Sequence, residues 1–268
     1  MTVTRSAYWR DLTTEDLRGL DAERWLALLP MGAIEQHGPH LPLDTDTCIA
    51  EGVVAAAMGR LPGDLRVLVL PTVTVGSSDE HTAFAGTISH PAETLIAMLC
   101  DLGDGVARAG LRKLVVLNAH GGQPQMVDIA ALRLRLRHCM LVVKANTFRF
   151  GVPPALFDEA ELRHGIHGGA IETSMMLHLC PERVRMDKAA EFRPISMTLE
   201  AANAQLRPGG AASFAWATQD QNASGAVGDA TQADAEKGRR AIGYMADVLI
   251  DILRDAMRFP LSNLRDGS

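Results

Sequence analysis

Four short runs of apolar residues constrain the fold more than any other feature of this sequence. They cover residues 25–29, 67–75, 113–117 and 140–145. The runs are almost continuously apolar rather than alternating, which is typical of strands buried on both faces of a sheet. Helical patterns fill the intervals at residues 46–61, 91–109 and 124–138. This alternation predicts an α/β fold, with a mainly parallel sheet covered by helices on both sides.

Two further helices are expected after the last strand. One begins near Gly169, and the other, at about 232–257, carries an amphipathic apolar series suited to closing the fold. The segment 181–229 has the least regular pattern and is expected to hold turns and loops. No internal repeat is visible. Because α/β folds often reach this length as a single unit, we expect residues 1–268 to form a single domain.

Composition and charge exclude several classes of protein. The formal net charge is -6 and the basic residues are scattered, so the electrostatic footprint of a nucleic-acid binder is missing. No window approaches the roughly 18 apolar residues that span a membrane, and the N-terminus has no apolar stretch typical of a signal peptide. The four cysteines are far apart and read as reduced structural residues. We therefore expect a cytoplasmic protein that binds neither membranes nor nucleic acids.

The densest group of polar residues follows the first predicted strand. Within a dozen residues braced by glycine and proline, the chain carries two imidazoles and three carboxylates: Glu35, His37, His40, Asp44 and Asp46. Each has a bland interpretation, since either aspartate could cap the next helix and Glu35 or His40 could be solvated. Ligands of open parallel sheets bind at the carboxyl ends of the strands, so five candidate ligands in a rigid loop at that edge favour a metal site.

Two more clusters follow later elements. His120 comes just after the third predicted strand, and Gly121 and Gly122 leave room for a ligand to approach the backbone. Glu172 falls in the first turn of the predicted helix near residue 169, where it could equally serve to pair with the helix dipole. His167 lies in the loop just before and could act as a proton carrier at the same site.

The polar stretch after the second predicted strand is a weaker candidate for a functional site. Its Ser78, Asp79, Glu80 and His81 could line a substrate pocket at the same sheet edge, together with Gly121 and Gly122. A polar turn without any ligand is an equally good interpretation of this stretch.

Three motifs in this order resemble the creatininase family. They are Glu35-Gln-His-Gly-Pro-His-Leu-Pro-Leu-Asp-Thr-Asp, Asn118-Ala-His-Gly-Gly and His167-Gly-Gly-Ala-Ile-Glu-Thr-Ser. The resemblance implies a three-layer α/β/α sandwich with a two-metal site of zinc or manganese, usually in a homohexamer. It also implies that Glu35 and His120 hold one metal, that His37 holds the other, that Asp46 bridges both, and that His167 is the proton shuttle.

The chain departs from creatininase itself in two places. Creatininase has a tyrosine and a glutamate directly after the histidine that His120 resembles, whereas this chain has Gly121 and Gly122. Glu172 is therefore the candidate for the remaining ligand of the second metal, with a role as base left open. Creatininase also has a tryptophan in the loop before the shuttle histidine, whereas residues 161–166 here contain no aromatic residue, which argues against creatinine as substrate.

The function expected from these residues is metal-dependent hydrolysis of a C–N bond in a small cyclic amide or a formamide, by a hydroxide that bridges two metals. His167 would deliver a proton to the departing nitrogen. Three alternatives stay open: a creatininase-like peptidase that trims a peptide-derived cofactor precursor, a metal-binding protein without catalysis, and a ring-opening enzyme or isomerase acting on a sugar. The last would need hydroxyl-binding groups at Ser77, Ser78 and Thr82.

Overall fold

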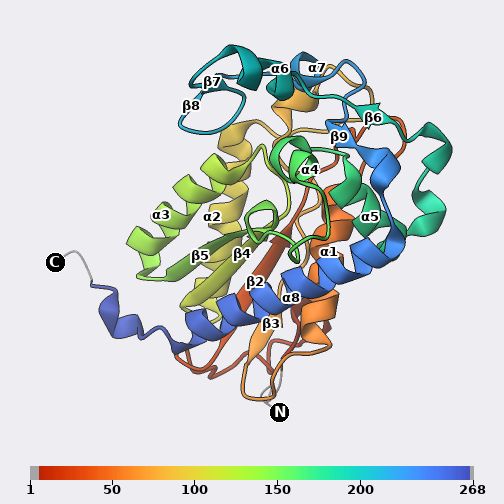
Figure 1. Cartoon of the computed structure of the whole chain (residues 1–268). Helices are drawn as coiled ribbons and strands as arrows, with labels where there is room; N and C mark the ends of the chain where they lie inside the picture. The colour runs from red at the N-terminus through yellow and green to blue at the C-terminus, as the bar shows by residue number, and fades with distance from the viewer. Residues whose placement is uncertain (1–5, 266–268) are drawn as a thin grey trace.

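A central sheet of five parallel strands organises the computed structural model, which describes residues 6–265. The strands are ordered β1-β3-β2-β4-β5 across the sheet (Figure 1). Their bounds are β1 Ala7–Tyr8, β2 Leu26–Met31, β3 Val67–Val69, β4 Lys113–Asn118 and β5 Leu141–Asn146. All of β2, β3 and β4 is buried, as the continuous apolar runs predicted.

Helices cover both faces of the sheet. Helices α1 (Thr45–Met58), α5 (Ala170–Leu179) and α8 (Ala235–Arg258) lie on one face, and α2 (Ala92–Arg108) and α3 (Pro124–His138) lie on the other. Strand β2 divides its side chains between the two cores, because Leu26 and Leu28 pack with the first group of helices while Ala27 and Leu29 pack with the second. The predicted three-layer α/β/α sandwich is confirmed.

Two predicted boundaries were wrong, and each has a local cause. The second strand ends at Val69 rather than at residue 75, since Pro71 has no N–H to give the sheet, although Val73 still forms an isolated bridge with Met31. The last helix begins at Ala235 rather than near 232, because the Asp234 side chain accepts a hydrogen bond from the Lys237 N–H and caps it there. Strand β1, at the edge of the sheet, was not predicted.

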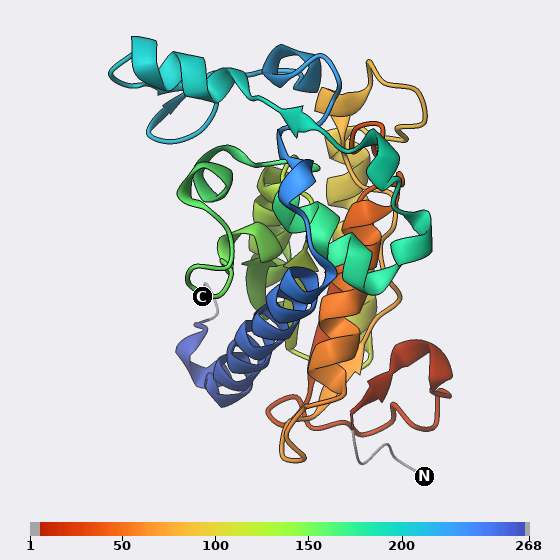
Figure 2. The same ribbon diagram turned by 45° about the vertical axis from the view of Figure 1, so that its right-hand side comes forward.

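The segment 181–229 is as irregular as expected. It contains the short elements β6 (Glu191–Phe192), α6 (Ile195–Ala202), β7 (Leu206–Arg207), β8 (Ala212–Ser213), α7 (Thr218–Gln221) and β9 (Gly228–Asp229). Helix α4 (Glu159–His164) precedes it. Figure 2 shows α6, β7 and β8 projecting beyond the sandwich, over the end of the molecule where the sheet strands finish. Within residues 6–265, no helix is both long and apolar enough to cross a membrane.

Candidate metal centre

Five acidic and imidazole side chains from four segments meet at the carboxyl edge of the sheet. Glu35 and His37 follow β2, Asp46 lies in the first turn of α1, His120 follows β4, and Glu172 lies in the first turn of α5. The segment around Glu35 is held in place by hydrogen bonds from the Glu35 N–H to the Leu43 carbonyl and from the Ile88 N–H to the Ile34 carbonyl. Neighbouring parallel strands finish at this edge, so residues that are distant in sequence become neighbours.

These side chains form two groups of donors that share Asp46. In the first group, His120 Nδ1 lies 3.1 Å from Glu35 Oε2 and 3.2 Å from Asp46 Oδ2. In the second, His37 Nε2 lies 3.2 Å from Asp46 Oδ1 and 3.9 Å from Glu172 Oε2. Within each group the ligand atoms all lie within 4.8 Å of one another, so each group could hold one metal ion. Asp46 turns one carboxylate oxygen toward each group, which is the arrangement of a bridging ligand.

Burial of the carboxylates supports a bound cation. Glu35 is 1% exposed and Asp46 is 2% exposed. While His120 Nδ1 carries no hydrogen, neither oxygen of Glu35 accepts a hydrogen bond from any residue in the range 6–265, and neither does Asp46 Oδ2. A buried carboxylate without hydrogen bonds costs several kcal/mol unless a cation compensates it. The donor set of imidazole and carboxylate suits zinc or manganese.

Backbone carbonyls orient both histidine ligands. His37 Nδ1 lies 3.1 Å from the Glu35 carbonyl oxygen, and His120 Nε2 lies 3.0 Å from the Ser77 carbonyl oxygen. A carbonyl can only accept, so each of these nitrogens carries a hydrogen and donates it. The other nitrogen of each ring, His37 Nε2 or His120 Nδ1, is then the one that a metal ion can use.

The electrostatics of the metal-free site favour protons at the histidine ligands. Burial alone would lower the pKa of His37, but Asp46, Glu172 and Glu35 outweigh it and raise this pKa to about 9. Burial raises the pKa of Glu172 to about 7, with the Asp46 charge adding to the effect. Bound cations would therefore displace protons that the carboxylates otherwise hold in the site.

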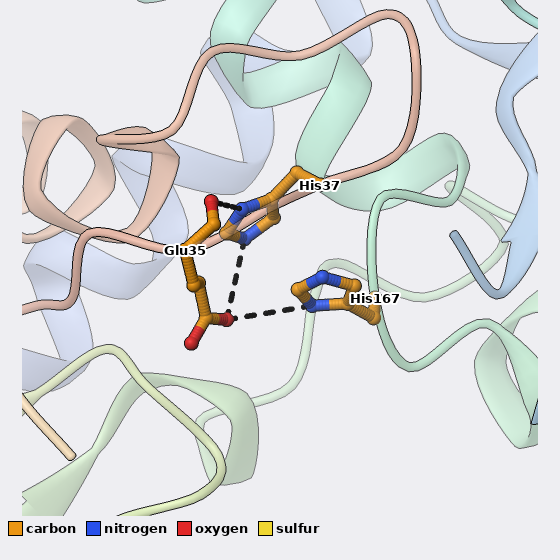
Figure 3. A group of neighbouring side chains, drawn as sticks. All are labelled: Glu35, His37 and His167. Atoms are coloured by element: carbon orange, nitrogen blue, oxygen red, sulfur yellow. Dashed lines mark hydrogen bonds and ion pairs between the residues drawn. The ribbon is translucent and has the colours of Figure 1, made fainter. Parts of the chain in front are cut away.

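His167 lies beside this centre and differs from His37 in its protonation. Its Nε2 lies 2.6 Å from the Gln36 carbonyl oxygen and donates to it, while Nδ1 lies 3.7 Å from Glu35 Oε1 (Figure 3). Burial together with the neighbouring His37 and His81 lowers the pKa of His167 well below its usual value. The ring is thus neutral and turns a bare nitrogen toward the candidate metal ligands, where it can accept a proton.

A cavity of about 840 Å³ opens over the centre. Its lining includes the candidate ligands Glu35, Asp46, His120 and Glu172 together with His167. Apolar side chains from α4 and from the segments around it complete the lining: Phe148, Leu162, Ile166, Phe214 and Trp216. Phe148, Leu162 and Ile166 are about half exposed, so the apolar surface reaches the mouth of the cavity.

The predicted substrate-binding residues divide into two sets. Glu80, His81, Gly121 and Gly122 line the cavity. Ser78 and Asp79 do not, because Ser78 is fully buried behind His120 and Asp79 accepts a hydrogen bond from Ser89 on the exterior.

The two remaining acidic or imidazole residues of the first motif, His40 and Asp44, lie away from the candidate metal ligands. The His40 ring bonds Thr173 and stacks on Phe192, and burial lowers its pKa to about 4. Asp44 forms an ion pair with Arg183. Both residues therefore hold the loop in place rather than facing the centre.

The space at Gly122 is filled by a carboxylate from another loop. A Cβ atom at this position would lie 1.8 Å from Glu80 Oε1 and 2.5 Å from His120 Nε2. Glu80 Oε1 lies 3.4 Å from His120 Nε2, and burial raises the pKa of the Glu80 carboxyl. The glycine thus admits an acidic side chain from the segment after β3 into the wall of the cavity.

Two features of the site were not foreseen from the sequence. Gln36 lies between two ligands of the first motif, and its side chain touches both His81 and His167. The position of Gln36 between two candidate ligands was the only feature of the sequence that could have indicated this role. Phe214 and Trp216 come from the irregular segment, where rare aromatic residues in a chain with 4% aromatics could have drawn attention.

Comparisons with known proteins agree with this geometry. The family model "Creatininase: Creatinine amidohydrolase" matches residues 10–253. The chain belongs to the creatininase family. Among solved structures, "Creatininase Mn" superposes with a TM-score of 0.76 and 26% identity, covering 95% of this chain and 100% of that one. The chain is therefore a creatininase-family hydrolase, and members with this fold include metalloenzymes.

Curated relatives in the family differ in what they act on. A "Mycofactocin precursor peptide peptidase" of Mycobacterium ulcerans is 37% identical over 227 residues, covering 82% of this chain and 81% of the relative. A "Creatinine amidohydrolase" of Pseudomonas putida is 29% identical over 209 residues, covering 72% of this chain and 79% of the relative. Membership in the creatininase family thus leaves the substrate to be argued from the site.

Proposed function

We propose that this creatininase-family protein is a two-metal peptidase that hydrolyses an amide bond in a short peptide. Glu35 and His120 would hold one zinc or manganese ion, His37 and Glu172 the other, and Asp46 would bridge them. This assigns the substrate to the peptide alternative of the sequence analysis. The small cyclic amide or formamide expected there becomes the second candidate.

The size and lining of the cavity carry the proposal. A volume of about 840 Å³ is much larger than a single small ring requires and falls in the range of drug-sized ligand pockets, roughly 300–1,000 Å³. The apolar wall around its mouth offers surface for peptide side chains on either side of the bond to be cleaved. Identity of 37% to a curated peptidase supports the same reading.

The chain's own residues can carry the proton steps. Two divalent ions in such a site would lower the pKa of water and polarise a carbonyl oxygen. His167 Nδ1, bare and facing Glu35, would accept the proton released when water attacks the carbonyl carbon. The same nitrogen would then deliver that proton to the departing amine. The hydrogen bond from His167 Nε2 to the Gln36 carbonyl keeps the ring in the tautomer that this exchange requires.

The second candidate, a small cyclic amide or formamide, is favoured by the family model and by the creatinine amidohydrolase relative. The sugar alternative loses support, because Ser77 and Ser78 are buried outside the cavity lining and Thr82 is exposed. A metal-binding protein without catalysis would not need His167 beside the ligands.

The test combines metal analysis with a substrate panel. Purified protein, Asp46→Ala and His167→Ala are analysed for zinc and manganese, then assayed on short apolar peptides, creatinine and simple formamides. We expect the wild type to hold two metals per chain and to turn over peptides, and we expect Asp46→Ala to lose both metals. His167→Ala should keep its metals and turn over peptides more slowly by an order of magnitude of 10²- to 10⁴-fold. Turnover of creatinine or formamides alone would select the second candidate, and two metals retained by Asp46→Ala would refute the site.

A further inference from the structure

Four histidines surround the candidate centre, and His81 differs from the other three in what it turns toward the centre. His37, His120 and His167 each donate one ring N–H to a backbone carbonyl and turn the other nitrogen inward. His81 has no carbonyl at either ring nitrogen among the hydrogen bonds of residues 6–265. Its Nδ1 lies instead 2.7 Å from Gln36 Nε2 and 3.1 Å from the Thr218 hydroxyl oxygen. A hydroxyl can donate or accept, so the Gln36 amide decides which nitrogen of the ring carries the hydrogen.

The Gln36 amide has only one orientation that its neighbours allow. Its Oε1 lies 2.9 Å from the Gly38 backbone N–H, which can only donate. Its Nε2 lies 2.9 Å from the Gly225 carbonyl, which can only accept. Exchanging the amide oxygen and nitrogen would break both hydrogen bonds, so Nε2 is fixed as the atom that faces His81.

This orientation fixes the tautomer of His81. Because the Gln36 NH₂ group can only donate, His81 Nδ1 must accept and cannot carry a hydrogen. The hydrogen of the neutral ring is then on Nε2. This N–H points to the centre, where its nearest carboxylate oxygens are Glu35 Oε1 at 3.4 Å and Glu80 Oε1 at 3.9 Å. Both distances are longer than a good hydrogen bond, so the donor is left available to a ligand in the cavity that His81 lines.

His81 and His167 converge on the same place. His81 Nε2 and His167 Nδ1 lie 3.4 and 3.7 Å from the same atom, Glu35 Oε1, and the two ring centroids are 4.4 Å apart. One ring thus presents a hydrogen-bond donor and the other a proton acceptor within reach of a single bound group. A carbonyl that is being hydrolysed needs both, a donor for its oxygen and a base for the attacking water.

We infer that His81 is a catalytic residue of the proposed hydrolysis, whose Nε2–H donates to the substrate carbonyl oxygen as that oxygen gains negative charge, with Gln36 as the positioning residue that sets its tautomer. This inference rests on the proposed function. As water's oxygen bonds to the carbonyl carbon, the electron pair of the C=O bond moves to the oxygen beside His81. When the C–N bond breaks, the electron pair on that oxygen re-forms the C=O bond, and the pair of the C–N bond stays on nitrogen, which takes the proton held by His167.

Three variants test the role of the donor. His81→Phe removes the N–H in a ring of similar shape, His81→Gln restores an amide N–H, and His90→Phe makes the same aromatic change in the same loop outside the cavity lining. Metal content is measured for each, followed by the dissociation constant of a phosphinic pseudo-dipeptide, whose tetrahedral phosphinate mimics the charged intermediate. Peptide kcat and KM are measured beside it.

The expected pattern separates a donor from a structural residue. His81→Phe should keep its metals and KM, lose 10²- to 10³-fold in kcat as an order of magnitude, and bind the phosphinate more weakly by a similar factor. His81→Gln should recover part of both losses, and His90→Phe should match the wild type. If His81→Phe keeps its metals and binds the phosphinate as tightly as the wild type, the inference is overturned.

The tautomer is measured separately by NMR of ¹⁵N-histidine-labelled protein, with His81 assigned from the spectrum of His81→Phe. A hydrogen on Nε2 and a bare Nδ1 support the inference, whereas a hydrogen on Nδ1 overturns it whatever the kinetics show. A wild type without metals or turnover would instead refute the proposed function. Failure of the inference alone would appear in an active, metal-bound wild type, either as His81→Phe behaving like the wild type or as a hydrogen on His81 Nδ1.

Discussion

His37 shows at the scale of one residue how the site is prepared for a cation. Its ring is fully buried, Nδ1 donates to the Glu35 carbonyl, and Nε2 faces Asp46 and Glu172. In the metal-free protein this nitrogen carries a proton at neutral pH, because the carboxylates around it outweigh the effect of burial. Metal and proton therefore compete for one atom.

This competition predicts how metal binding depends on pH. With a metal-free pKa of about 9 at His37, apparent manganese affinity should rise roughly tenfold per pH unit for each proton released, and level off above pH 9. The same pKa shift has the opposite effect on the stability of the metal-free fold, which falls as pH rises. A pKa raised above the unfolded value of 6.5 adds stability that is complete below that value and is lost as pH rises through about 9. Titrations of metal-free protein from about pH 6 to 10 test this, and an affinity independent of pH would contradict it.

Gly122 is a second residue whose close neighbours determine the effect of a substitution. A methyl group there would collide with Glu80 Oε1 at 1.8 Å and with the ring of His120 at 2.5 Å, so Gly122→Ala should displace both side chains. We expect metal affinity to fall by about tenfold or more, since groups that orient a metal-binding histidine typically contribute that much. Gly121→Ala is the matched control, because nothing lies within 4 Å of its Cβ position. Equal metal affinity of the two variants would mean that Glu80 moves aside freely.

At the scale of elements, helix α8 holds the helix that carries Glu172. Gly238 of α8 packs directly against the backbone of α5, where an added Cβ would lie 1.8 Å from the Ser174 carbonyl oxygen. Backbone cannot move aside as a flexible side chain can, so the two helices would have to separate. Helix α5 places Glu172 in its first turn, and its position depends on this contact.

Alanine at two glycines of α8 should therefore act in opposite directions. Gly238→Ala should destabilise the protein by about 1–3 kcal/mol or more through overpacking. Gly243→Ala, with nothing within 4 Å of its Cβ position, should stabilise it by up to about 1 kcal/mol, because alanine is the better helix former. Urea unfolding with metal present compares the two. If Gly238→Ala were more stable than the wild type, α5 and α8 would not be packed so closely at Gly238 that a methyl group must separate them.

Helices and strands could be predicted from the sequence where burial leaves a pattern of apolar residues. Strands β2, β4 and β5 and the five main helices were foreseen, because the strands appear in the sequence as continuous apolar runs and the helices as periodic patterns. Glu35, His37, Asp46, His120 and Glu172 were foreseen in one region because parallel strands end at one edge, and the resemblance to the creatininase family selected them from the candidates there. The cavity wall was not, since Phe214 and Trp216 reach it through a segment whose path depends on tertiary contacts, such as the hydrogen bond from Thr218 to the Glu80 carbonyl.

At the scale of the whole molecule, the candidate centre joins segments that are far apart in the sequence. The loop after β2, the start of α1, the loop after β4 and the start of α5 contribute its ligands, from position 35 to position 172. A single domain over residues 1–268, a cytoplasmic location and a homohexameric assembly stay predictions. An ion bound at this centre would link the sheet to the helix layer on one of its faces, since the candidate ligands follow β2 and β4 or lie in the first turns of α1 and α5.

Metal removal should consequently lower the stability of the entire fold. Ligands that bind only the folded state add about 2.7 kcal/mol at 100-fold excess over their dissociation constant. For a protein of this size, that corresponds to a fall in Tm of roughly 5–10 °C on chelation. Calorimetry with metal, with chelator and after metal is restored measures the shift, and Asp46→Ala, which lacks the shared ligand, should show none. A wild type whose Tm ignores the chelator would mean that the buried carboxylates of Glu35 and Asp46 are compensated by protons alone.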